Sequence, residues 1–377
     1  MVTEVQISAR QFGILVALFT IGTPILIIPA GLAGIVKQDA WLAAVLGVGL
    51  GLLITGIYTA LGRRFPTKSL VEMNELVFGK WIGKTISITF IFFNLVTAAE
   101  LLFFVGNFMT TQIMPETPIQ SVHILFACIV MMGIRLGIET LARSAEVLFP
   151  LFVLLFIILV IFLSPQIKIE NIQPVLDTNF KVLLKGTIFF ASVFSLAPVV
   201  LLMIFPASVN RNKEAKKAFF SGTLIGGFVL IMIIALTILV LGADTTARQM
   251  YPSYTLAKKI NVGNFLQRIE IIMAGMWFIT IFFRVCCYFY ASVIGLAQTL
   301  NLKDYRFLVL PLGIIVLALS LIVHPNVVHS EEYNKREWIP YATTYGLVLP
   351  LLLLGIQSLR KKESDGDPPS QDVGGQK

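Results

Sequence analysis

Long apolar segments separated by short polar stretches run along almost the whole chain. A helix needs roughly 20 apolar residues to cross the hydrocarbon core of a bilayer, and ten segments come close to that length or exceed it. They predict ten transmembrane helices, at about residues 12–36, 40–62, 84–110, 119–137, 144–164, 181–206, 217–242, 266–299, 306–324 and 338–359.

The polar segments between these helices predict an orientation. With both termini on the inner side, the inner segments hold 18 Lys and Arg residues and the outer segments hold 10. Since inner loops are enriched in Lys and Arg, both termini are expected inside. The segment 66–80 (PTKSLVEMNELVFGK) has apolar residues at helical spacing and predicts a short interfacial helix on that side.

Composition supports an integral membrane protein. Hydrophobic residues make up 56% of the 377 residues and charged residues only 13%, whereas soluble domains carry about 25% charged residues. The net charge of +8 could indicate nucleic-acid binding, but the charges lie in short loops between spans, where orientation explains them better. The first span follows a short polar stretch, so no cleaved signal peptide is expected.

The sequence offers little for catalysis or metal binding. The cysteines Cys128, Cys286 and Cys287 lie inside apolar segments, and the three histidines are scattered near the ends of spans. No metalloprotease, phosphate-loop or nucleophile-elbow motif is present. We therefore expect no metal, no cofactor and no enzymatic activity.

The first apolar segment is interrupted at its centre. It reads ILVALFTIGTPILIIPAGLAGIV, with Gly22, Thr23 and Pro24 in the middle. Proline removes a backbone N–H and glycine removes the restriction on the backbone. An unwound backbone at membrane depth is tolerated only where protein buries it or where it lines a cavity. The interruption therefore predicts a broken helix and a binding site, with a simple proline kink as the alternative.

The sixth segment carries a matching interruption. It reads KVLLKGTIFFASVFSLAPVVLLMIFPA, and Ser195, Leu196, Ala197 and Pro198 lie near its middle. The first and sixth spans open two halves of five spans each, and an odd number of spans inverts the second half. Paired interruptions of this kind indicate a transporter-type site at the bilayer midplane. The free N–H groups of the half-helices would favour an anionic ligand group such as a carboxylate.

Two full charges are predicted deep in the membrane. Glu100 lies in the third span, with Val96 on the same helical face, and Arg284 lies in the eighth span, one turn after Thr280. Such charges usually face a cavity or a partner. We hypothesise that Glu100 and Arg284 approach each other, directly or through water, and border a ligand pocket. The alternative is a buried ion pair that only joins the two spans.

The chain resembles the B subunits of GerA-type spore germinant receptors, the endospore germination permease family of the amino acid–polyamine–organocation superfamily. The resemblance covers about residues 5–362 and depends on the combination of several stretches in order. These are ISARQFGILVALFTIGTPILIIP, KQDAWLAAVLG, FPTKSLVEMNELVFGKWIGK, IENIQPVLDTNFKVLLKGT and RIEIIMAGMWFITIFFRV.

The resemblance implies an all-α integral membrane fold of the LeuT/APC-like type. Ten transmembrane helices would form two inverted five-helix repeats, at about 12–164 and 181–359, with helices 1 and 6 broken. One domain would span residues 1–362, followed by a disordered polar tail over 363–377. The implied pocket, completed by neighbours of the two breaks, comprises Gly22, Thr23, Ile25, Val96, Glu100, Phe194, Ser195, Thr280 and Arg284.

The resemblance also implies a location and partners. The protein would lie in the inner membrane of a spore, with an A subunit and a C subunit lipoprotein as partners and a small nutrient as ligand. The sequence leaves three functions open: a nutrient sensor, a secondary transporter coupled to H⁺ or Na⁺, and a water or ion pathway. Resemblance favours the sensor, while the fold alone does not decide.

Overall fold

The computed structural model describes residues 6–260 and 269–364. The described chain is helical, and an isolated bridge joins Ile7 to Val209. The predicted tail falls almost entirely on residues 365–377, which lie outside the described residues.

The first span consists of two helices, α1 (Ala9–Ile21) and α2 (Pro24–Val36). A capping box starts α1, since the Ser8 side chain accepts from the Gln11 N–H and the Gln11 side chain accepts from the Ser8 N–H. Gly22 follows its last turn, and Pro24 occupies the first position of α2, where a missing N–H costs nothing. The predicted interruption of this span is confirmed.

The sixth span is interrupted in the same way. Helix α8 (Phe180–Phe194) ends one residue before the predicted break, and the chain resumes as the 3₁₀ helix η5 (Ala197–Met203). Ser195 and Leu196 lie between the two helices and are buried. The second predicted interruption is therefore also confirmed.

The remaining predicted spans are all helical. The first half continues with α3 (Ala40–Arg64), α5 (Lys80–Phe108), α6 (Ile119–Leu136) and α7 (Ile138–Leu163). The second half continues with α9 (Asn212–Leu241), α12 (Glu270–Thr299), α13 (Arg306–Ile322), and a last segment made of α15 (Trp338–Thr343), η6 (Thr344–Val348) and α16 (Leu349–Ser364).

Shorter elements connect these helices. The interfacial segment folds as α4 (Leu70–Phe78), again with a capping box, between Ser69 and Glu72, and with Leu70, Met73 and Val77 buried. Helices α10 (Ala243–Arg248), α11 (Pro252–Lys258) and α14 (Val327–Arg336) belong to the second half. Single turns are η1 (Lys37–Asp39), η2 (Met109–Ile113), η3 (Ser164–Gln166) and η4 (Ile169–Ile172).

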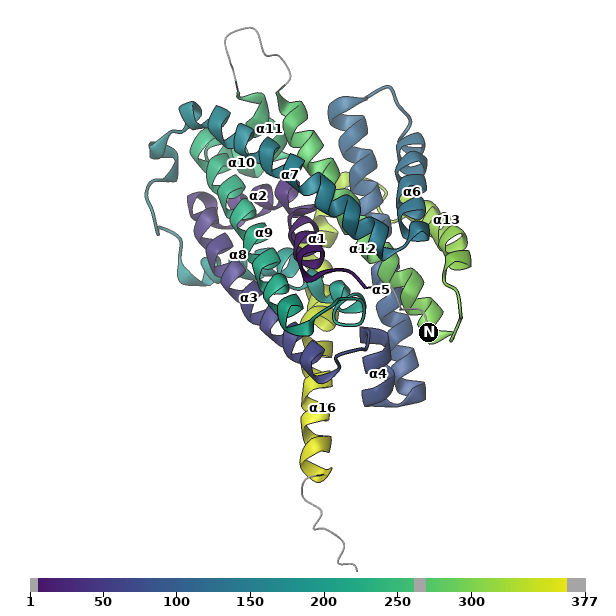
Figure 1. Ribbon diagram of the computed structural model, residues 1–377. Coiled ribbons are helices and arrows are strands. Elements are labelled where there is room, and N and C mark those ends of the chain that lie inside the picture. The colour runs from purple at the N-terminus through teal and green to yellow at the C-terminus, as the bar shows by residue number, and fades with distance from the viewer. Residues whose placement is uncertain (1–5, 261–268, 365–377) are drawn as a thin grey trace, which may run out of the picture.

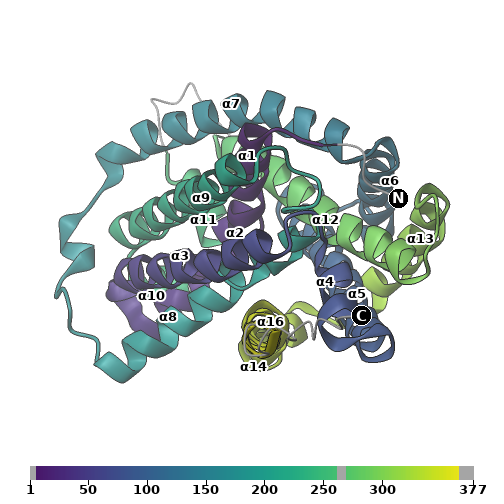
Figure 2. The same ribbon diagram turned by 60° about the horizontal axis from the view of Figure 1, so that its bottom comes forward.

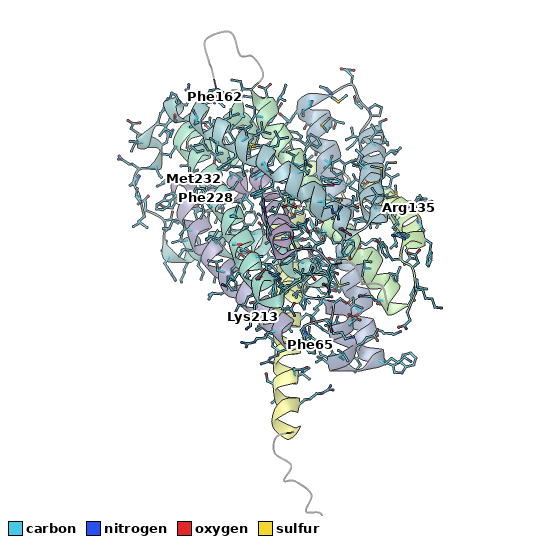
Figure 3. The ribbon with its side chains drawn as sticks, in the orientation of Figure 1. Phe65, Arg135, Phe162, Lys213, Phe228 and Met232 are labelled. Carbon is cyan, nitrogen blue, oxygen red and sulfur yellow. The ribbon has the colours of Figure 1, made fainter. Side chains whose placement is uncertain are left out.

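By length and composition, eight helices of the described chain can cross a membrane, or nine if α13 and the start of α14, bent by 107°, count as one broken span. Here α2 and α3 count as one apolar stretch, and α1 is shorter. The outer surfaces are apolar: Phe228, which Figure 3 shows at the edge of α9, is 57% exposed. Such a surface fits contact with lipid.

The two broken spans lie inside the bundle. Figure 2 shows α1 and α2 near the middle, with α3, α8 and α9 on one side and α5, α12 and α13 on the other. Helix α1 contacts both α9 and α12, while α2 contacts α8. Helix α16 extends away from the rest of the molecule (Figure 1). The interruptions are therefore placed where several helices can reach them.

Candidate functional site

Arg284 connects the two broken spans. It projects from α12 and is only 2% exposed. Its Nη1 donates to the Phe19 carbonyl at 3.2 Å, and its Nη2 donates to the Val193 carbonyl at 3.1 Å. These carbonyls belong to the last turns of α1 and α8, where the helix dipole places partial negative charge. The guanidinium carbon also lies 5.0 Å from the centre of the Phe19 ring. One cation thus neutralises the ends of both half-helices.

Gly22 makes room for this arginine. A Cβ atom at position 22 would lie 2.5 Å from Arg284 Cδ and 3.1 Å from Arg284 Cβ. Both distances are shorter than a normal carbon–carbon contact, so only glycine fits without movement. The structure therefore brings together two of the predicted site residues.

The backbone of the second break is bound by side chains from two further helices. The Tyr58 hydroxyl of α3 lies 3.1 Å from the Leu196 carbonyl and donates there and to a carbonyl of η6. Trp338 Nε1 of α15 donates to the Ser192 carbonyl at 3.2 Å. Unsatisfied carbonyls are costly in a membrane, and these bonds explain how the unwound segment is tolerated.

The first break is held less completely. The Ile25 carbonyl accepts a hydrogen bond from Ser253 Oγ of α11 at 2.6 Å. Among the described residues, the buried Thr23 hydroxyl and Arg284 Nε have no hydrogen-bond partner at bonding distance, while the Arg284 side chain also interacts with the Tyr288 hydroxyl. Thr23 directly follows Gly22 in the chain, and Gly22 packs against Arg284. Both polar groups therefore belong to the region of the first break. They are candidates to meet a polar ligand.

Three other predicted residues have partners of their own. The Thr280 hydroxyl bonds back to its own helix, 3.0 Å from the Trp277 carbonyl. Ser195 Oγ donates to the Gly47 carbonyl of α3 at 3.1 Å. Phe194 is fully buried against Phe190, with ring centres 5.1 Å apart. A ligand that uses these groups has to displace existing contacts.

The hypothesis that Glu100 directly approaches Arg284 is wrong. Both nitrogens at the end of the guanidinium are engaged by backbone carbonyls, and Glu100 Oε1 instead lies 3.8 Å from His324 Nε2. The Tyr288 hydroxyl interacts electrostatically with both Arg284 and Glu100. The backbone carbonyls at the two breaks compete with Glu100 for Arg284, and the sequence contains no signal for such backbone acceptors. Val96 lies one turn before Glu100 and is partly buried.

A cavity of about 490 Å³ lies beyond the breaks, along α2 and α8. It reaches α5, the α10–α11 segment and α14, and Figure 1 shows α10 and α11 close to α2. Lining residues include Ile27, Gly31, Phe189, Arg248 and Ser330. None of the nine predicted site residues lines this cavity. It adds a vestibule that the sequence did not reveal.

Three residues that bind the broken backbone were not among those predicted from the sequence, namely Tyr58, Trp338 and Ser253. A signal was available, since a Tyr or Trp inside an apolar span brings a donor that needs an acceptor. Within the described residues, no group of three or more His, Cys, Asp or Glu side chains could hold a metal ion.

The arrangement of helices is similar to that of several solved structures, including transporters. The chain superimposes on MhsT in complex with L-phenylalanine with a TM-score of 0.65, covering 94% of this chain and 99% of that one at 12% identity. The nucleobase-cation-symport-1 transporter Mhp1 gives a TM-score of 0.63, covering 92% and 79% at 10% identity. The protein is thus a multi-pass membrane protein with a LeuT/APC-like fold, which confirms the predicted fold class.

Sequence relatives then define the family. The family model described as "Spore germination protein" matches residues 6–328. Spore germination protein KB of Bacillus subtilis (strain 168) is 30% identical over 368 residues, covering 96% of this chain and 97% of that protein. Spore germination protein GerLB of Bacillus cereus is 25% identical, covering 97% and 98%. The chain belongs to the spore germination permease family, as the resemblance indicated.

Proposed function

We propose that the chain is the nutrient-binding membrane subunit of a spore germinant receptor in the spore inner membrane. A small molecule, an amino acid or a sugar, binds where α1 meets α2 and where α8 meets η5. The signal then passes to an A subunit and a C subunit lipoprotein. Membership of the family supports the class of function. The observation that supports the site is the double contact of Arg284 with Phe19 and Val193.

The chemistry of this contact favours an oxygen-rich ligand. A guanidinium binds a carboxylate through two parallel charge-assisted hydrogen bonds, which are stronger than bonds to neutral carbonyls. A ligand carboxylate, or the vicinal hydroxyls of a sugar, would compete with the carbonyls of Phe19 and Val193 for Arg284. The free Thr23 hydroxyl would add a further polar contact.

Competition at Arg284 also provides a signal. As long as both carbonyls hold the guanidinium, α1 and α8 are joined through one side chain. A ligand that takes the guanidinium releases both helix ends at once, so binding energy is converted into a rearrangement of the broken spans. The 490 Å³ vestibule along α2 and α8 offers the route by which the ligand arrives.

Spores that carry this receptor alone provide the test. We expect germination with a subset of amino acids, sugars and salts, and loss of that response when Gly22 is replaced by leucine. Gly49→Leu is the matched control, because a Cβ at position 49 of α3 meets no atom within 4 Å. An unchanged response in Gly22→Leu spores would contradict a ligand site at the first break.

A secondary transporter is the second candidate, since solved structures with this fold include transporters. The solved neighbours include a Na⁺-coupled sialic acid symporter at a TM-score of 0.64, 11% identical and covering 91% of this chain. Labelled nutrient accumulating in vesicles that contain only this chain would support transport. Binding without accumulation would support the sensor.

A further inference from the structure

A cluster of ionisable side chains surrounds Glu100 at the bend between α13 and α14. His324 lies in the bend, with Nε2 3.8 Å from Glu100 Oε1. On its other side, His324 Nδ1 lies 3.0 Å from His329 Nδ1. Among the side chains that the structure describes, neither Glu100 Oε1 nor His324 Nε2 has a hydrogen-bond partner. The Glu100 carboxyl and the imidazoles of His324 and His329 therefore lie in a line. This line is not part of the ligand site proposed above.

The line runs from the interior to the surface. The side chains of Glu100 and His324 are only 5% and 1% exposed, whereas His329 is exposed. Helix α14 has the sequence VVHSEEYNKR, and so many charged and polar residues cannot lie in hydrocarbon. His329 is therefore in contact with water or with the polar headgroup region.

Local structure holds the two histidines in place. Pro325 follows His324 and prevents the helix from continuing. Asn326 caps α14 by accepting from the His329 backbone N–H at 2.9 Å. The His324 ring packs edge-on against Phe103 of α5, with ring centres 5.2 Å apart. The turn between α13 and α14 therefore places the imidazole rings of His324 and His329 next to each other.

We propose that His329 and His324 form a proton path that loads and unloads the buried Glu100 carboxyl from the aqueous surface. The proposal concerns a proton-binding site with an access route, and it depends neither on the identity of a nutrient nor on the proposed nutrient site.

The proton balance follows from the two tautomers of His324. Solvent protonates His329 on Nε2, and its Nδ1 proton passes to His324 Nδ1. His324 gives its Nε2 proton to the Glu100 carboxylate across the short gap, which closes by a small movement of either side chain. His329 is left neutral with its proton on Nε2, His324 with its proton on Nδ1, and Glu100 as the carboxylic acid. One proton has entered, and the reverse sequence releases it.

Other ionisable groups near this line do not replace the imidazoles. Glu100 also interacts with the hydroxyls of Tyr333 on α14, Tyr341 on α15 and Tyr288 on α12. Phenols hold their protons at neutral pH, so they donate hydrogen bonds but do not carry protons there. Tyr288 also interacts electrostatically with Arg284. Imidazole is the side chain whose unperturbed pKa places its change of charge between pH 5 and 8.

The test is the rate at which Glu100 takes up a proton. The full-length chain in lipid nanodiscs is subjected to a rapid pH change, and the protonated-carboxyl band is followed by infrared spectroscopy. The band that Glu100→Gln abolishes belongs to this residue. We expect its appearance to be slowed about tenfold or more in His324→Gln and His329→Gln, because an amide forms hydrogen bonds but cannot relay a proton.

A matched control and a rescue separate a proton path from a structural role. His123 is buried and lies 2.9 Å from Ser320 Oγ through Nδ1, outside the line, so His123→Gln is expected to leave the rate unchanged. Added imidazole is expected to restore the rate in His329→Gly, whose surface position avoids misfolding. Wild-type rates in His329→Gly, slow uptake that imidazole does not restore, or the absence of any band sensitive to Glu100→Gln would each overturn the proposal.

Discussion

Gly22 and Arg284 are in direct contact: a Cβ at position 22 would lie 2.5 Å from Arg284 Cδ. The contact joins the first break to α12, and through the two hydrogen bonds of the guanidinium it also reaches the second break. Gly22, which interrupts the first span, therefore controls the position of the Arg284 side chain, which connects the two broken spans.

Replacing Gly22 by alanine tests this contact. The added methyl group has to push the arginine aside, and overpacking of this kind typically costs 1–3 kcal/mol. We expect a lower unfolding temperature for the detergent-solubilised protein, measured by fluorescence or calorimetry. Gly49→Ala, which adds a methyl group in open space, is expected to leave the unfolding temperature unchanged or slightly raised. Equal effects of the two substitutions would show that helix propensity, and not the contact, matters.

Arg284→Lys tests the bidentate geometry. Lysine keeps the charge but presents a single ammonium group in place of the planar fork. We expect it to lose at least one of the bonds to Phe19 and Val193, and bonds to charged groups contribute about 1.5–3 kcal/mol each. The nutrient response should fall strongly in Arg284→Lys spores. A full response would show that positive charge alone suffices.

The charge exchange of Glu100→Arg with Arg284→Glu is expected to fail. The two residues form no ion pair: the Glu100 carboxyl lies nearest His324, and the Arg284 guanidinium binds backbone carbonyls. The double variant places a carboxylate against the partial negative charge of two helix ends. Receptor level and nutrient response should therefore remain as low as in the worse single variant. Restoration by the second substitution would show that the two charges act mainly as a pair.

Tyr58→Phe removes the hydroxyl that binds the second break. The single proton of this hydroxyl is shared between the Gly346 carbonyl at 2.7 Å and the Leu196 carbonyl at 3.1 Å, so both carbonyls lose a donor, at a cost of about 1–3 kcal/mol. We expect a measurable loss in unfolding temperature. Tyr305→Phe is the control, because that hydroxyl bonds a carbonyl at the longer distance of 3.4 Å from a half-buried position. A larger loss for Tyr305→Phe would contradict the assignment.

The breaks and the helices were predictable from the sequence because their causes are local. Proline and glycine next to each other in the middle of a span weaken the helix there, although single prolines such as Pro150 and Pro311 lie inside continuous helices. An apolar stretch has to be long to cross a bilayer. Both predicted interruptions are found, and each of the ten predicted segments is found as one helix or as several consecutive helices.

The partners of these local features were not predictable. The Val193 carbonyl and Arg284 are 91 residues apart, and the Ile25 carbonyl and Ser253 are 228 apart. Opposite charges suggested a pair between Glu100 and Arg284, but the nearest acceptors for the arginine are backbone atoms that carry no sequence signal. The histidines at 324 and 329 were set aside as scattered, although a sharp bend brings them together.

The Tyr58 hydroxyl has a second acceptor, the Gly346 carbonyl at 2.7 Å, three residues before α16 begins. Arg64, at the end of the same helix α3, holds α16 through the Leu354 carbonyl. Near its far end, Arg360 of α16 in turn bonds the Leu76 carbonyl of α4. The last helix is therefore tied at several heights to the same elements that hold the second break, so it forms a rigid extension of that frame.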